Sequence, residues 1–219
     1  MHLNLSILPS GLSRKFQRVF RENLFQGFHS RSGNGSDLSQ TKEIQDELPA
    51  ILDRYGIKSM LDIPCGDLHW MSKVAFADVH YTGADIVGEL IRELNASKEN
   101  LGKSFILLDI TKTTPGTYDA IFCRDLFVHL NTRQVINSIR NIKKSNSKYL
   151  ITTTFTGNRV YKNLPLVSRG IAWRPINLQL KPFHFPEPNF ILNEKCTEGD
   201  GSFSDKSLGI WEVRKLPNL

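Results

Sequence analysis

Residues 59–67 read SMLDIPCGD, and this stretch tells more about the architecture than any other part of the 219-residue chain. A short apolar run ends in an acid, Asp62, and a turn follows at Gly66. Two later apolar runs also end in acids, because Asp85 follows Asp62 by 23 residues and Asp109 follows Asp85 by 24. Each interval suits one strand–helix repeat. Parallel strands present their carboxyl ends side by side, so we expect a row of acids along one ligand crevice.

The rest of the chain continues this alternation of strand and helix patterns. We expect helices at 16–24, 44–55, 70–75, 89–98 and 131–142. We expect strands at 59–65, 81–86, 105–110, 118–123 and 148–155, followed by a hairpin of strands 190–194 and 208–213. This order predicts an α/β fold, a Rossmann-like three-layer sandwich whose mostly parallel sheet carries an antiparallel C-terminal strand pair.

The chain is long enough for one large domain with short additions. We expect residues 1–40 to form an N-terminal helix and a Gly/Ser lid segment, and 41–219 to form the domain itself. The glycine-serine cluster at 32–36 suits either a lid over a ligand or a flexible hinge. Residues 156–190 combine prolines with aromatic residues, which suits either an acceptor lid or an ordinary cover for the sheet.

Bulk properties exclude several classes. No apolar run approaches the ~20 residues that span a bilayer. The net charge of +6 is spread along the chain, which favours a solvated surface over a nucleic-acid interface. Cys65, Cys123 and Cys196 are scattered without metal-ligand spacing, so we expect free thiols, no metal site and a cytoplasmic location. The basic, acid-poor segment 1–21 leaves an organelle-targeting peptide as the alternative. The oligomeric state stays open.

Three segments together resemble a known family. They are LDIPCGD at 61–67, the acids that end the next two strands, and RDLFVHL at 124–130. This set is similar to the class I S-adenosylmethionine-dependent methyltransferases, over roughly residues 57–155. The family's glycine-rich turn keeps only its middle glycine here, Gly66, because Pro64 and Leu68 occupy the two other usual glycine positions.

The resemblance implies S-adenosylmethionine as cofactor. It implies that Gly66 lets the backbone approach the ligand and that Asp62 orients the turn and the cofactor's amino group. Asp85 would accept hydrogen bonds from both ribose hydroxyls, and Asp109 would accept from the adenine amino group. The expected cofactor-binding residues are Asp62, Pro64, Cys65, Gly66, Asp85, Ile86, Asp109, Ile110 and Arg124.

A nicotinamide dehydrogenase is the main rival for this fold. Such an enzyme needs a G-x-G-x-x-G turn, whose backbone amides contact a diphosphate. This chain offers one glycine, Gly66, followed by the carboxylate of Asp67. An acid-rich pocket suits a phosphate-free sulfonium cofactor better.

The acceptor residues are expected after the fourth strand and in the proline-rich segment. His129 could act as the general base with Asp125 orienting it or binding substrate, or His129 could only pack beside the cofactor. Trp173, Arg174 and His184 are the expected substrate-binding residues. We expect O-methylation of a small-molecule or glycan hydroxyl. The alternatives are N-methylation of nucleic acid or protein, with nucleic acid not favoured, and a non-catalytic methyltransferase-like subunit.

Overall fold

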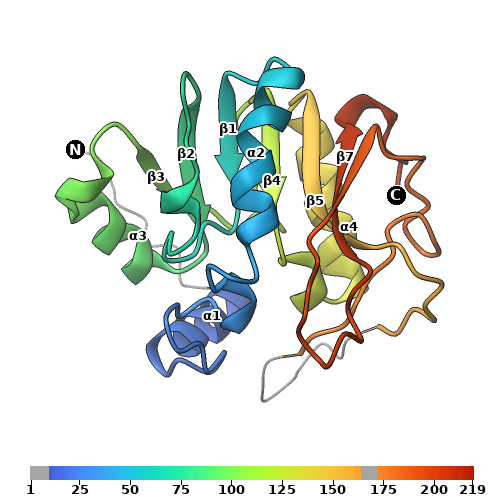
Figure 1. Cartoon of the computed structure of the whole chain (residues 1–219), viewed down its shortest axis with the longest axis horizontal. Coiled ribbons are helices and arrows are strands. Elements are labelled where there is room, and N and C mark those ends of the chain that lie inside the picture. The colour runs from blue at the N-terminus through green and yellow to red at the C-terminus, as the bar shows by residue number, and fades with distance from the viewer. Residues whose placement is uncertain (1–9, 164–171) are drawn as a thin grey trace.

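The computed structural model describes residues 10–163 and 172–219, which build a seven-stranded sheet in the order β3-β2-β1-β4-β5-β7-β6 (Figure 1). The strands are β1 (Ser59–Asp62), β2 (His80–Asp85), β3 (Ser104–Leu107), β4 (Ala120–Cys123), β5 (Tyr149–Phe155), β6 (Phe190–Asn193) and β7 (Lys206–Glu212). The first five strands pair in parallel. β7 pairs antiparallel with both β5 and β6, so the predicted terminal hairpin is confirmed.

Four α-helices accompany the sheet in the described ranges. They are α1 (Gly11–Arg21), α2 (Lys42–Arg54), α3 (Gly88–Ala96) and α4 (Thr132–Lys144). α4 begins at the predicted capping box, in which the Asn131 and Gln134 side chains each accept from the other residue's backbone N–H. α2 continues through Pro49, and Gly56 follows its end at a φ of 60°. None of these helices is both long and apolar enough to cross a membrane.

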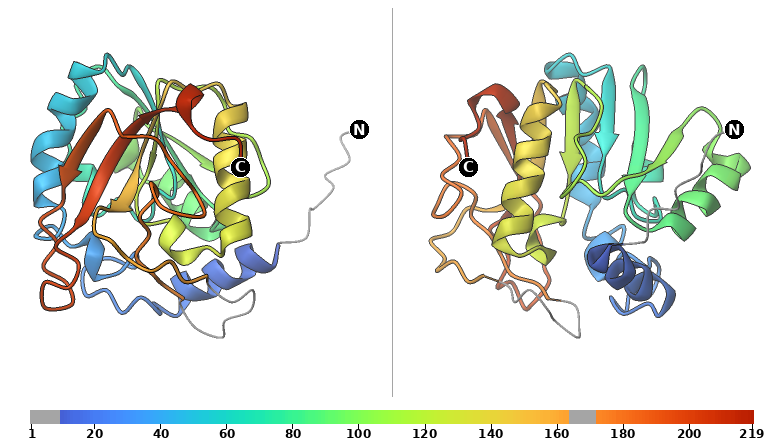
Figure 2. Two further views of the ribbon diagram at one scale, coloured as in Figure 1. Left: turned by 90° about the vertical axis from the view of Figure 1, so that its right-hand side faces the viewer. Right: turned by 180° about the vertical axis from the view of Figure 1, so that it is seen from behind.

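The strand β1 shows how one sequence builds two cores. Side chains alternate between the faces of a strand. Met60 therefore packs in the core formed with α2 and α3, whereas Leu61 packs in the core formed with α4. Figure 2 shows α4 on the face of the sheet opposite α2. The predicted three-layer sandwich is confirmed.

One predicted element is wrong. The segment 70–75 is not an α-helix, because only a 3₁₀ turn forms there, at Met71–Lys73. Leu68 has a φ of 59° and Val74 is already extended, so few residues between them can adopt helical geometry. The first helix also ends earlier than predicted, at Arg21. The described part of 156–190 contains no helix or strand before β6 begins at Phe190.

Candidate active site

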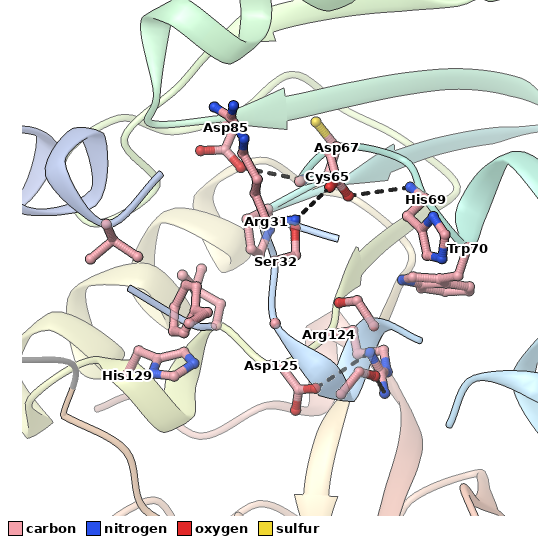
Figure 3. Close-up of a pocket in the computed structure, with 18 of the residues that line it drawn as sticks. Arg31, Ser32, Cys65, Asp67, His69, Trp70, Asp85, Arg124, Asp125 and His129 are labelled. Carbon is pink, nitrogen blue, oxygen red and sulfur yellow. Dashed lines mark hydrogen bonds and ion pairs between the residues drawn. The ribbon is translucent and has the colours of Figure 1, made fainter. Parts of the chain in front are cut away.

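A cavity of about 510 Å³ opens at the carboxyl ends of β1, β2 and β4. The sheet grows from β1 in two directions, with β2 and β3 on one side and β4 and β5 on the other. Open α/β sheets bind their ligands at such a change of direction, between β1 and β4 in this sheet. Phe16, Val19 and Phe20 of α1 line the cavity from outside the sheet, together with residues 31–36. Figure 1 shows α1 at this end of the sheet, and Figure 3 shows Asp85 and Asp67 across the cavity from Asp125 and His129.

Asp62 is a buried carboxylate at the end of β1. Its Oδ2 accepts a hydrogen bond of 2.6 Å from the Tyr81 hydroxyl. Burial raises the pKa of Asp62 to about 7, because desolvation outweighs that hydrogen bond. No lysine or arginine of the described ranges forms an ion pair with Asp62, and the more distant charge of Arg124 only partly offsets the effect of burial on its pKa. The site thus holds a carboxyl group that a bound cation or donor would stabilise in its charged form.

Asp85 ends β2 in a similar environment. Its Oδ1 accepts from the Val87 amide at 3.0 Å and its Oδ2 accepts from the Gly66 amide at 3.3 Å. Burial nevertheless raises the pKa of Asp85 to about 6. Two buried acids therefore face the same cavity, and both favour a ligand that brings hydrogen-bond donors.

The glycine-serine segment 32–36 and the two residues before it pack against the turn after β1. Asp67 accepts from the Ser30 hydroxyl at 2.9 Å and from the Arg31 amide at 2.8 Å. Gly66 has a φ of 54°, and a Cβ there would stand 2.3 Å from the Ser32 hydroxyl oxygen. Only glycine meets both requirements, so Gly66 permits the close contact between the turn and the segment.

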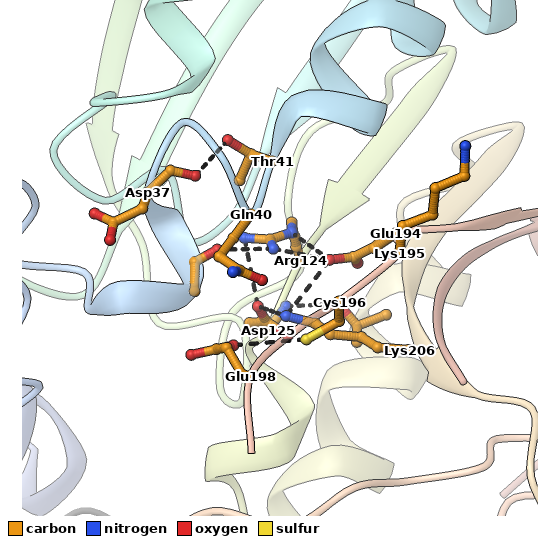
Figure 4. Close-up of polar contacts among 12 residues, drawn as sticks. Asp37, Gln40, Thr41, Arg124, Asp125, Glu194, Lys195, Cys196, Glu198 and Lys206 are labelled. Carbon is orange, nitrogen blue, oxygen red and sulfur yellow. Dashed lines mark hydrogen bonds and ion pairs between the residues drawn. The ribbon is translucent and has the colours of Figure 1, made fainter. Parts of the chain in front are cut away.

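On the opposite side, four charged side chains form one buried network (Figure 4). The Arg124 guanidinium lies 2.8 Å from Glu194 and 3.4 Å from Asp125. Lys206 Nζ lies 2.6 Å from Asp125 and 3.5 Å from Glu194. Burial would raise the pKa of Asp125, but the charges of Lys206 and Arg124 lower it to about 2. Arg124 also donates to the carbonyl oxygen of Gly35 at 2.9 Å, which ties the network to the glycine-serine segment.

His129 is held in one tautomer. Its Nδ1 lies 2.9 Å from the carbonyl oxygen of Ala172, and a carbonyl only accepts, so Nδ1 carries the proton. Burial lowers the pKa of His129, which keeps the ring neutral at pH 7. Its Nε2 then carries a free lone pair in a residue that lines the cavity. Phe25 packs against the ring at 5.0 Å between centroids.

Comparison with known proteins identifies the architecture. No protein-family model matches the chain, and no curated protein matches its sequence. Solved structures do match. TnmH aligns with a TM-score of 0.57 and 14% identity, over 80% of this chain and 56% of TnmH. The mitomycin 7-O-methyltransferase MmcR aligns with a TM-score of 0.56 and 16% identity, over 80% of this chain and 54% of MmcR.

A third match covers most of both proteins. An S-adenosylmethionine-dependent methyltransferase from Clostridium acetobutylicum aligns with a TM-score of 0.55 and 12% identity, over 78% of this chain and 90% of the other. The fold is that of the class I S-adenosylmethionine-dependent methyltransferases. The cavity described above thus lies at the ligand end of a methyltransferase fold.

The methyltransferase fold brings most of the expected cofactor residues to the cavity. Those that line it are Asp62, Pro64, Cys65, Gly66, Asp85, Ile86 and Arg124. Asp109 and Ile110 are not among the lining residues. Because β3 ends at Leu107, Asp109 falls in the following turn, where it accepts from Ser10 and Thr111. Ile110 packs in the core on the α4 face.

Of the three expected substrate-binding residues, only one lines the cavity. Trp173 lines the cavity, whereas Arg174 is buried and donates to the carbonyl oxygens of Phe127 and Val128. Arg174 therefore holds the backbone of the turn that leads to His129. His184 is exposed and is not among the residues lining the cavity.

Sequence reasoning missed Glu194 and Lys206. The sequence signal for them was weak: Glu194 ends the first predicted hairpin strand, and Lys206 lies in the predicted loop, two residues before the second strand. Sequence reasoning also missed Asp67 as the anchor of the glycine-serine segment.

Proposed function

We propose that this chain is an S-adenosylmethionine-dependent methyltransferase that methylates a hydroxyl group of a small molecule or glycan. The observation that carries the proposal is the pair of buried carboxylates, Asp62 and Asp85, around Gly66 in a methyltransferase fold. Asp85 suits a ribose diol and Asp62 suits the cofactor's amino group. A diphosphate fits poorly beside these acids, which argues against a nicotinamide cofactor.

The chemistry divides between cofactor and protein. S-adenosylmethionine supplies a methyl group activated on a sulfonium. The cavity would hold the acceptor oxygen next to that methyl group, which would provide proximity and alignment, and S-adenosylhomocysteine would be the leaving group. His129 Nε2 receives the hydroxyl proton, since the ring is neutral and Nδ1 is occupied. A similar fold occurs in the mitomycin 7-O-methyltransferase MmcR, which supports a hydroxyl acceptor.

The proposal is tested first by calorimetric titration of the purified protein with S-adenosylhomocysteine, with NAD as the control ligand. We expect binding of the first ligand only. Preference for NAD would overturn the proposal, and absence of binding to either would leave a cofactor-free module.

Asp85→Ala should weaken S-adenosylhomocysteine binding by ~1–3 kcal/mol, which is the scale of a lost charge-assisted hydrogen bond. Asp109→Ala is the matched comparison, because Asp109 also follows a strand but is not among the lining residues. We expect its affinity to match the wild type. If only Asp109→Ala loses affinity for S-adenosylhomocysteine, Asp109 contacts the adenine ring, and the ribose role of Asp85 is wrong.

A further inference from the structure

The part of the cavity lined by Asp125, His129 and Trp173, where the acceptor would bind, is its acceptor side. This side has an aromatic wall. Trp173 and Phe203 both line the cavity, and their ring centroids lie 4.7 Å apart in an edge-on arrangement. Phe155 supports both rings from behind, at 5.9 Å from Trp173 and 6.2 Å from Phe203. Rings that pack edge-on against one another hold their orientation. The wall therefore offers a preformed surface for a planar ring near His129.

Beside this wall lies a group of ion-paired side chains in which two carboxylate oxygens receive no hydrogen bond. The two cations, Arg124 and Lys206, are both engaged in ion pairs with Asp125 and Glu194. Within the described chain, Asp125 Oδ1 and Glu194 Oε1 are buried without a hydrogen-bond partner. Asp125 lines the cavity together with a further acid, Glu198, whereas Glu194 lies behind them and is not among the lining residues. Buried oxygens of this kind usually find a partner, so a ligand that donates is favoured here.

We infer that the acceptor is a hydroxylated aromatic ring that also carries an amino group. This inference rests on the proposed function and names the substrate class of the same site. The ring packs against Trp173 and Phe203, and the amino group donates to Asp125 Oδ1 and Glu198. The hydroxyl faces His129. A carboxylate or phosphate in place of the amine meets acids whose neighbouring cations are already paired.

The test uses two small probes that differ only in one group. Tyramine and 3-(4-hydroxyphenyl)propionate share the phenol and the two-carbon chain, but one ends in an amine and the other in a carboxylate. Each is titrated into protein saturated with S-adenosylhomocysteine. We expect tyramine to bind at least ~10-fold more tightly, which corresponds to about 1.4 kcal/mol. Methyl transfer from labelled S-adenosylmethionine should then appear on the phenolic oxygen.

Variants identify the source of the preference. Glu198→Gln keeps the shape of the side chain and removes its charge, so it should reduce the preference for tyramine several-fold. Phe203→Leu should weaken both probes equally. Glu99→Gln, on an exposed 3₁₀ turn, is the control that leaves both unchanged.

The outcomes separate this inference from the proposed function. Equal affinity for the two probes, preference for the carboxylate, or binding of neither probe while S-adenosylhomocysteine binds would each overturn the inference alone. Failure of S-adenosylhomocysteine itself to bind would overturn the proposed function.

Discussion

At the scale of single residues, one hydrogen bond prepares His129 for acid–base chemistry. The Ala172 carbonyl accepts from Nδ1 and leaves Nε2 as the basic atom. Burial lowers the pKa of the ring below its ordinary value of 6.5, so the neutral form persists into mildly acidic solution. A base must be unprotonated to accept a proton, so the neutral ring suits the role proposed for it.

We predict that His129→Ala lowers turnover by about 10²-fold or more, the usual contribution of a positioned base. Cofactor affinity should change little. In the wild type, turnover should rise with pH around a midpoint below 6.5, because the pKa of His129 is lowered, and this rise should vanish in the variant. His184→Ala is the matched control, since His184 is exposed and is not among the lining residues. Normal turnover in His129→Ala would show that His129 only packs in the cavity wall and is not a base.

At the scale of elements, the hairpin of β6 and β7 completes a cavity that the parallel strands begin, because Lys206 and the loop before it line the cavity. Asp125 follows β4 with a φ of 55°, a conformation uncommon for a residue with a side chain. Its amide donates to Thr153 of β5 and its carboxylate accepts from Lys206 of β7. Two neighbouring strands thus hold the turn after β4 in place, and the antiparallel edge has a role in the site as well as in the sheet.

The hairpin offers a direct test of this role, because it carries two ion-paired lysines. Lys206 is buried and pairs with Asp125, whereas Lys195 pairs with Glu43 through a side chain that is 72% exposed. Lys206→Met should lower the free energy of unfolding by about 3–5 kcal/mol, because the buried carboxylate of Glu194 and the half-buried carboxylate of Asp125 lose a buried counter-charge. Lys195→Met should cost about 0–1 kcal/mol.

Urea denaturation of both variants measures the difference. Equal and small losses would show that Lys206 contributes no more than a surface pair.

At the scale of the whole molecule, the buried acids that line the cavity affect stability. Burial raises the pKa of Asp85 from 3.8 in the unfolded chain to about 6 in the folded protein. Between these values the folded state binds a proton that the unfolded state does not. The contribution to stability is therefore complete below pH 4 and is lost as the pH rises through 6. A cavity built to hold donors in this way makes the empty protein less stable at neutral pH.

We predict that Asp85→Asn removes the part of the pH dependence that Asp85 contributes, whereas Asp62, whose pKa is also raised, keeps its own part in both proteins. The unfolding free energy of the wild type relative to the variant should fall by roughly 3 kcal/mol between pH 4 and pH 7. The pKa of His129 is lowered and acts in the opposite direction, but both proteins retain that residue. Urea titrations at several pH values check the result. Parallel stability curves for the two proteins would contradict a raised pKa at Asp85.

Local spacing was sufficient to predict the alternation of strands and helices, the capping box at Asn131, and the placement of Asp62, Gly66 and Asp85 at one ligand cavity. These features depend on residues close together in the chain, since a strand's end and the turn after it follow from a few neighbouring side chains. Asp109 shows the limit of this reasoning, because β3 ends at Leu107, before the predicted end of that strand, and Asp109 is not among the residues that line the cavity.

The acceptor side depended on contacts between distant parts of the chain. Lys206 and Asp125 are 81 residues apart, and Arg124 and Glu194 are 70 apart. Ser30 reaches Asp67 across 37 residues. No local pattern encodes such pairs, because they follow from strand order, from the insertion of β7 between β5 and β6, and from the path of the loops. The placement of Asp62, Gly66 and Asp85 at the cavity could thus be predicted from short-range periodicity, whereas only the tertiary structure decided the ion-pair network around Asp125.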